Sequence, residues 1–107
     1  MKVKEMLTDT DFIMGNPIGF AIRERVYCKD GFNISIQKSS AHYCRSGEVE
    51  LGFPSEKVEE LEMYAENWDI PTKTVYGYVP LSLIEAIVAT HGGIDKELSM
   101  KNRRKLC

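Results

Sequence analysis

The sequence predicts a single α+β domain in which a small antiparallel sheet, a meander plus a later strand, is covered by two helices. Apolar and polar residues alternate in short stretches between residues 18 and 53, as they do in half-buried strands. A further strand-like stretch, Thr74–Tyr78, leads through a proline into a pattern with helical spacing. Because 107 residues leave room for one modest core, we expect residues 1–107 to form one domain.

The N-terminal segment, residues 1–15, is predicted to be a short helix or an arm. Val3, Met6 and Leu7 have the i, i+3, i+4 spacing of one or two helical turns. The turn signal Gly15-Asn16-Pro17 then separates this segment from the predicted sheet.

The first two strands are predicted to form a hairpin. Apolar residues alternate over Ile18–Ile22, and the strand can extend to Val26 and Cys28. The pair Asp30-Gly31 is a hairpin turn signal, and alternation resumes over Phe32–Gln37. We expect the apolar members of the second strand to share one face of the sheet.

A polar run, residues 38–47, is predicted to be a loop or a ragged strand that ends near Gly47, before a third strand. Alternation at Val49, Leu51 and Phe53 indicates that strand, and Pro54 ends it. Ser55 is predicted to cap a helix that extends to Trp68, with glutamates on its solvent face. The apolar face of this helix would comprise Val58, Leu61, Ala65 and Trp68.

A second helix is predicted to start near Ser82, which forms an S-x-x-E capping box with Glu85. Gly92 is suited to its C-terminal cap. Residues 94–107 are predicted to be a basic tail or a short surface helix. The apolar face of the second helix would comprise Ile84, Ile87, Val88 and His91.

Composition favours a chain that works inside a cell. The sequence has no apolar run of the roughly 20 residues that a membrane span needs, and no apolar run of signal-peptide length at its start. Cys28, Cys44 and Cys107 are odd in number and contain no C-x-x-C motif, which suits a reducing compartment. We therefore expect a cytoplasmic protein, with a Cys28–Cys44 disulfide as the open alternative.

The familiar catalytic and cofactor motifs are absent from the sequence. Cys28, His42, Cys44 and His91 are permissible zinc ligands, but their spacing matches no standard structural site. Cys44 and His42 also fit a nucleophile and a base, without an evident third group to orient them. We expect no catalytic residues, no metal and no cofactor.

The charged segments have two interpretations each. The glutamates of the predicted Ser55–Trp68 helix suit a solvated face, although they could hold a cation or mimic nucleic acid. The formal charge of −2 is too small to favour nucleic-acid mimicry. Phosphate binding would use Lys101, Arg103, Arg104 and Lys105, which also suit an exposed tail, and we expect no stable DNA binding.

One set of aromatic and polar residues has the composition of a nucleotide site, although a small domain also uses such aromatics in its core. Aromatic rings stack on bases, while arginine, hydroxyl and amide groups bind phosphates and polar edges. The predicted base contacts are Phe32, Tyr43 and Tyr76, and the predicted polar contacts are Gln37, Ser39, Ser40 and Arg45.

Four blocks of sequence resemble a family of small bacteriophage and prophage proteins. They are VYCKDGFNISIQKSSAHYCR, VELGFPSE, YAENWDIPTKTVYGYVP and HGG, which lie between residues 26 and 93. More narrowly, they resemble the phage anti-Thoeris sponge proteins. The chain departs from the family pattern where Arg45-Ser46-Gly47 replaces a longer segment.

The resemblance implies an anti-defence protein, not an enzyme, in the cytoplasm of a host bacterium. It would sequester an immune signalling nucleotide, either a cyclic ADP-ribose isomer or a cyclic oligonucleotide, without cleaving it. We expect a homo-oligomer, because two chains can enclose a ligand. The alternatives are a phage inhibitor that binds a host protein through an apolar or strongly charged patch, and a small nucleotide-acting enzyme.

Overall fold

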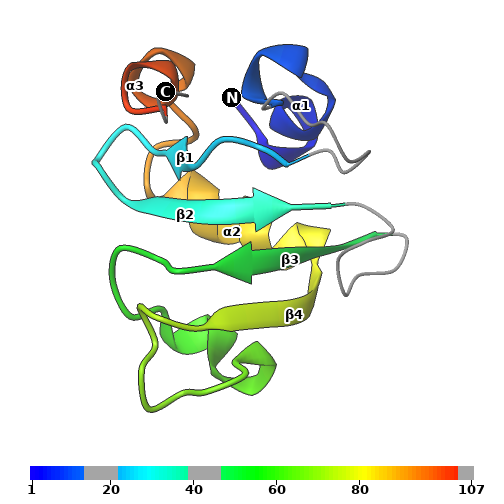
Figure 1. Cartoon of the computed structure of the whole chain (residues 1–107), viewed down its shortest axis with the longest axis vertical. Coiled ribbons are helices and arrows are strands. Elements are labelled where there is room, and N and C mark those ends of the chain that lie inside the picture. Colours follow the sequence, from blue (N-terminus) through cyan, green and yellow to red (C-terminus); the bar gives the residue numbers. More distant parts are fainter. Residues whose placement is uncertain (14–21, 39–46, 104–107) are drawn as a thin grey trace.

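Four antiparallel strands form an open sheet in the order β1-β2-β3-β4, which makes the chain an α+β protein (Figure 1). The computed structural model describes residues 1–13, 22–38 and 47–103. The strands are β1 Val26–Tyr27, β2 Asn33–Gln37, β3 Glu48–Gly52 and β4 Val75–Pro80. The helices are α1 Val3–Thr8, α2 Leu81–Thr90 and α3 Lys96–Lys101, with 3-10 turns η1 Thr10–Phe12 and η2 Glu59–Tyr64.

The β1-β2 hairpin has the turn that the sequence predicted. Val26 pairs with Ile34 and the chain reverses through Asp30-Gly31. Gly31 has a φ of +98°, a conformation that glycine adopts without steric cost. The Asp30 carboxylate accepts the amide of Phe32 at 2.9 Å, which holds the turn closed.

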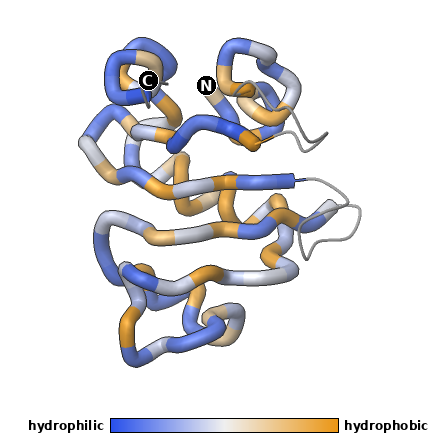
Figure 2. Tube along the Cα trace, viewed as in Figure 1, coloured by the Kyte–Doolittle hydropathy of each residue, from blue (hydrophilic) through white to orange (hydrophobic). Residues whose placement is uncertain are grey.

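The predicted apolar faces of β2 and β3 are confirmed except at Phe53, which lies beyond the end of β3, is 48% exposed and has a φ of +52°. Ile34 and Ile36 on β2, and Val49 and Leu51 on β3, are completely buried. The residues between them alternate toward the polar end of the hydropathy scale, as the tube colouring shows (Figure 2). The apolar face packs against α2, which lies behind the sheet in Figure 1.

Helix α2 supplies the other half of the core, also as predicted. Ile84, Ile87 and Val88 are buried, and Gly92 ends the helix with a φ of +90°. His91 is the C-cap residue, so it does not belong to the buried helical face.

The predicted capping box of α2 does not form. Ser82 makes no capping hydrogen bond, and Pro80 is the N-cap residue. The Glu85 carboxylate instead accepts the amides of Val3 at 2.7 Å and Lys4 at 3.0 Å, at the start of α1. Glu85 lies far from α1 in sequence but next to it in space. Its carboxylate therefore accepts hydrogen bonds from two amides that have no acceptor within α1.

The first strand differs from its predicted position. Most of the predicted Ile18–Ile22 strand lies outside the described residues, and Ile22 itself is 44% exposed and outside any strand. Among the described residues, regular pairing begins at β1, after an isolated bridge between Ile13 and Arg23. Within the predicted N-terminal segment the structure forms α1 and then η1.

The predicted α-helix Ser55–Trp68 is wrong, because only the 3-10 turn η2 forms within it. Ser55 accepts the amide of Asn33 at 3.0 Å instead of capping a helix, and only η2 is helical. Beyond η2, Ala65 bridges to Tyr76 along the outer edge of β4. This pairing draws the chain into an extended form, and glutamates at helical spacing would repel one another in an α-helix.

Helix α3 confirms a short helix within residues 94–107, and its first turn joins the two ends of the described chain. Lys96 forms ion pairs of 2.8 Å with both Asp9 and Asp11. Before α3, Ile94 and Met1 exchange two hydrogen bonds.

In the described part of the chain, no helix combines the length and apolarity that crossing a membrane requires.

Candidate functional site

A β-bulge interrupts the pairing of β3 with β4. Val49 pairs with Val79 and Leu51 pairs with Tyr76, so Glu50 alone faces two residues of β4, Gly77 and Tyr78. An extra residue on one strand shifts the faces of the residues that follow it. Val79 therefore takes the buried position that regular alternation would give to Tyr78.

Tyr78 is turned outward by this bulge and is 46% exposed. Its φ of +58° lies in the left-handed region, which is unfavourable for a residue with a Cβ. Gly77 precedes it, and glycine inside a strand commonly marks such a bulge.

Beside the bulge lies a pocket with a volume of ≈ 520 Å³. The sheet contributes Glu50, Val75, Gly77 and Tyr78 to its lining. The η2 region contributes Met63, Tyr64 and Glu66. The Glu66 amide donates to the Val75 carbonyl at 2.9 Å, and this bond holds the η2 side of the pocket against β4.

The pocket carries two carboxylates that lack a cationic partner. Within the three described ranges, neither Glu50 nor Glu66 forms an ion pair or a side-chain hydrogen bond. Glu50 is half-buried and Glu66 is exposed. Negative charge with aromatic rings alongside it attracts a cation and repels a phosphate.

The surrounding chain strengthens this negative potential. Residues 47–69 hold eight of the sixteen acidic residues and only one of the fourteen basic residues. That lysine, Lys57, lies 5.1 Å from the Trp68 ring and 3.5 Å from Glu59, so its charge is engaged outside the pocket. The pocket can therefore hold a guanidinium or ammonium group, with Tyr64 and Tyr78 as aromatic neighbours.

The nucleotide site predicted from sequence is only partly within the described residues. Ser39, Ser40, Tyr43 and Arg45 lie outside them. The described members are Phe32, Gln37 and Tyr76, and all three are buried.

Each of the three is buried and has a structural role in the fold. Tyr76 is completely buried and donates its hydroxyl to the Pro71 carbonyl at 2.6 Å, and burial raises its pKa. Gln37 exchanges hydrogen bonds with the backbone of Arg23 at 2.8 and 2.9 Å. Phe32 is 4% exposed. Phe32 and Tyr76 are therefore core residues. This agrees with the alternative that a small domain uses such aromatic residues in its core.

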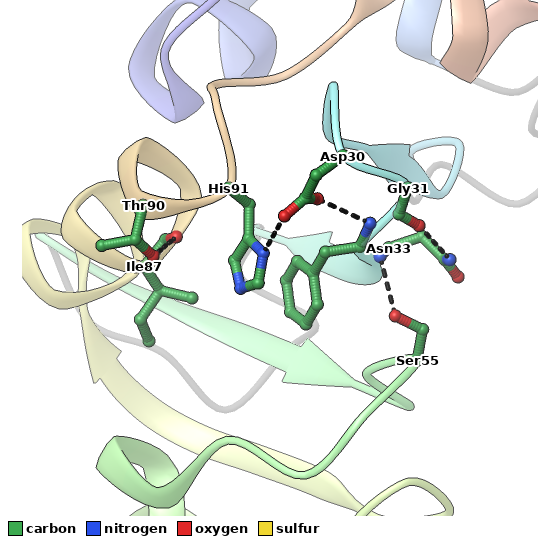
Figure 3. A network of polar contacts seen from close by, with 8 residues as sticks. Asp30, Gly31, Asn33, Ser55, Ile87, Thr90 and His91 are labelled. Atoms are coloured by element: carbon green, nitrogen blue, oxygen red, sulfur yellow. Dashed lines mark hydrogen bonds and ion pairs between the residues drawn. The ribbon is translucent and has the colours of Figure 1, made fainter.

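Asp30 and His91 form a polar cluster at the C-terminal end of α2 (Figure 3), and the Phe32 ring packs against it. The His91 ring stacks on Phe32 at a centroid distance of 4.1 Å, and its Nδ1 lies 2.6 Å from Oδ2 of Asp30. The Phe32 amide and the His91 ring lower the pKa of Asp30. Because Lys29 and Asp30 also donate amides to the carbonyls of Gly93 and His91, the cluster fastens the hairpin turn to α2.

The proposed metal ligands do not assemble among the described residues. Cys28 is a free, buried thiol whose pKa burial raises to about 11, and His91 is paired with Asp30. His42 and Cys44 lie outside the described ranges. In the part that the structure covers, no group of three or more histidine, cysteine or acidic side chains is placed to bind a metal.

Sequence reasoning missed the pocket because its residues come from separate predicted elements. Glu66 and Met63 fall within a predicted helix, and Tyr78 falls at the end of a predicted strand. The signal in the sequence was Gly77 between two tyrosines, which is typical of a bulge. Nothing local indicated that η2 would lie beside it.

Comparisons of the chain with protein-family models, with curated proteins and with solved structures found no match.

Proposed function

We propose that this chain is a binding protein whose pocket beside the β4 bulge receives an arginine or lysine side chain of a partner protein. The observation that carries the proposal is that Glu50 and Glu66, in a pocket with two tyrosines, have no ion-pair partner among the described residues. This function corresponds to the alternative of an inhibitor that binds a host protein through a strongly charged patch.

A protein segment fits this surface better than a free small cation. Met63 is 82% exposed at the pocket, which offers apolar contact area to residues that flank the bound cation. A charge-assisted hydrogen bond contributes about 1.5–3 kcal/mol, and a cation–π contact at an exposed site about 0.5–1 kcal/mol. A short basic peptide is therefore expected to bind with a Kd of roughly 10–500 µM.

The test is a calorimetric titration with an arginine-containing hexapeptide and with its citrulline counterpart. Citrulline keeps the shape of arginine and removes its charge, so we expect binding of the arginine peptide alone. Glu50→Gln and Glu66→Gln should each weaken that binding by about fivefold, since each removes one charged acceptor. Spermidine is included to distinguish a protein segment from a free polyamine.

Glu62→Gln is the matched control. Like the two pocket substitutions, it removes one negative charge, but Glu62 lies in η2 and does not line the pocket. Equal weakening by Glu62→Gln would mean that only the overall charge attracts the peptide, and the proposal would fail. Equal binding of the citrulline peptide would also contradict it.

The nucleotide-sequestration hypothesis stays a prediction of the sequence resemblance. The same titration with cyclic ADP-ribose isomers and cyclic oligonucleotides tests it, followed by chromatography of the released ligand. Tight binding of an intact nucleotide that both pocket variants leave unchanged would favour sequestration over the function proposed here.

A further inference from the structure

The charge of this chain is separated between two ends of the fold. The acidic segment, residues 47–69, contributes η2 and one wall of the pocket. The basic segment, residues 96–105, contains five basic residues and one acidic residue. Of its described cations, Lys96 is paired with Asp9 and Asp11, whereas Lys101 and Arg103 are exposed.

The two charged segments lie on opposite sides of the sheet's width. Helix α3 contacts β1, whereas η2 contacts β4, and these are the two edge strands. Three interstrand spacings separate the edges by roughly 14 Å. Figure 1 shows α3 and η2 at opposite ends of the longest axis, which extends 33 Å.

The basic segment is too short to enter the pocket of its own chain. Arg104 and Lys105 follow Arg103 directly, and two residues span at most about 7 Å. That reach is about half of the separation between the edge strands, and α3 and η2 both lie beyond those edges. The described cations of the basic segment and the acidic pocket therefore lie at opposite ends of one chain, whereas two copies can bring them together.

We propose that the basic segment Lys101–Lys105 of one copy occupies the β4 pocket of a second copy. The inference rests on the proposed function, because it assigns a specific occupant to the same cation pocket. The contact joins two different surfaces, so the copies associate head to tail and each addition leaves one pocket and one basic segment available. Association is therefore expected to increase with concentration and to weaken with salt.

The first measurement is the average mass of the full chain by sedimentation equilibrium at low salt. Between about 10 µM and about 1 mM, we expect the mass to rise above that of a monomer, as a Kd near 0.1 mM requires. About 0.5 M NaCl should return the chain to a monomer, because the Debye length falls to roughly 4 Å. A monomer at every concentration overturns the inference.

Charge reversal identifies the two surfaces. One variant carries Lys101→Glu, Arg103→Glu, Arg104→Glu and Lys105→Glu, and the other carries Glu50→Lys and Glu66→Lys. Each variant alone presents like charges at the contact and should stay monomeric. Mixed in equal amounts, they present opposite charges again, so association should return to within about threefold of the wild-type affinity. Failure of the mixture to associate overturns the inference.

Addition of the arginine hexapeptide to the wild type gives a measurement that needs no variant to fold. A tenfold excess should displace the basic segment and return the average mass to that of a monomer, while the citrulline peptide should not. If the hexapeptide binds through Glu50 and Glu66 while the chain is monomeric, only the self-association is wrong. If the hexapeptide does not bind, the proposed function is wrong.

Discussion

At the level of single residues, Tyr78 combines a strained backbone with a position in the candidate pocket. Its left-handed conformation costs about 1–2 kcal/mol relative to an ordinary strand residue. The surrounding pairing imposes this conformation, because Val79 on one side and Tyr76 on the other are both completely buried. The bulge thus places a tyrosine at the pocket at a cost in stability.

We expect Tyr78→Gly to be more stable than Tyr78→Ala by about 1 kcal/mol, because both variants lose the ring but only alanine keeps the strained Cβ. Urea denaturation of the two variants measures the difference. Val75 is the control, since it has ordinary strand geometry and glycine there should be less stable than alanine. A more stable alanine variant at position 78 would show that the backbone is relaxed.

Asp30 links the stability of the hairpin turn to pH. Its pKa is lowered below the ordinary value of 3.8, first by the Phe32 amide and then by His91. A carboxylate with a lowered folded-state pKa stabilises the protein above its unfolded-state pKa. That contribution is lost as the pH falls through the folded-state pKa.

We therefore expect wild type to be more stable than Asp30→Asn at neutral pH, and the difference to shrink as the pH falls below 3.8. Denaturant titrations of both proteins at several pH values measure it. Asp69→Asn is the control, because Asp69 is exposed and outside the cluster. A difference that grew on acidification would contradict the assigned sign.

At the level of elements, α1 depends on a helix far from it in the chain. Alone, six residues are too few for a stable helix, because the costly first turn has little to propagate. The Glu85 carboxylate binds two amides of its first turn, and buried Val3 and Met6 hold the other side against the core. The start of α1 is thus stabilised by α2.

We expect Glu85→Ala to lower the free energy of unfolding by about 1–2 kcal/mol, since two amides of α1 lose their acceptor. Ser82→Ala should cost less than about 0.5 kcal/mol, because Ser82 is exposed and caps nothing. Thermal and urea denaturation compare the two variants. Equal costs would mean that the local capping box forms after all.

At the level of the whole molecule, the acidic segment repels itself in the folded state. Eight acidic residues against one lysine in residues 47–69 cannot be neutralised locally. Excess charge of one sign destabilises a compact state, and salt screens it over a Debye length of about 10 Å at 0.1 M.

We expect the Tm to rise by a few degrees when NaCl increases from about 20 mM to about 200 mM, because screening relieves this repulsion. Scanning calorimetry measures the shift. Glu59→Gln combined with Glu62→Gln should reduce the salt dependence, since both residues lie in η2. A Tm that falls with salt would show that favourable ion pairs outweigh the repulsion.

The sequence by itself determined the hairpin turn, the core faces of β2 and β3, and the buried side of α2. These features depend on the spacing of apolar residues, on turn residues and on the positions of glycines. All of these signals lie within a few residues of one another, so the local sequence predicts them. The tertiary structure decided that Glu85 caps α1, that Tyr76 and Gln37 are core, and that η2 replaces an α-helix. It also assembled the pocket from Glu50, Glu66 and Tyr78. Each of these outcomes depends on contacts between segments distant in the chain, and such contacts override local propensity without a local signature.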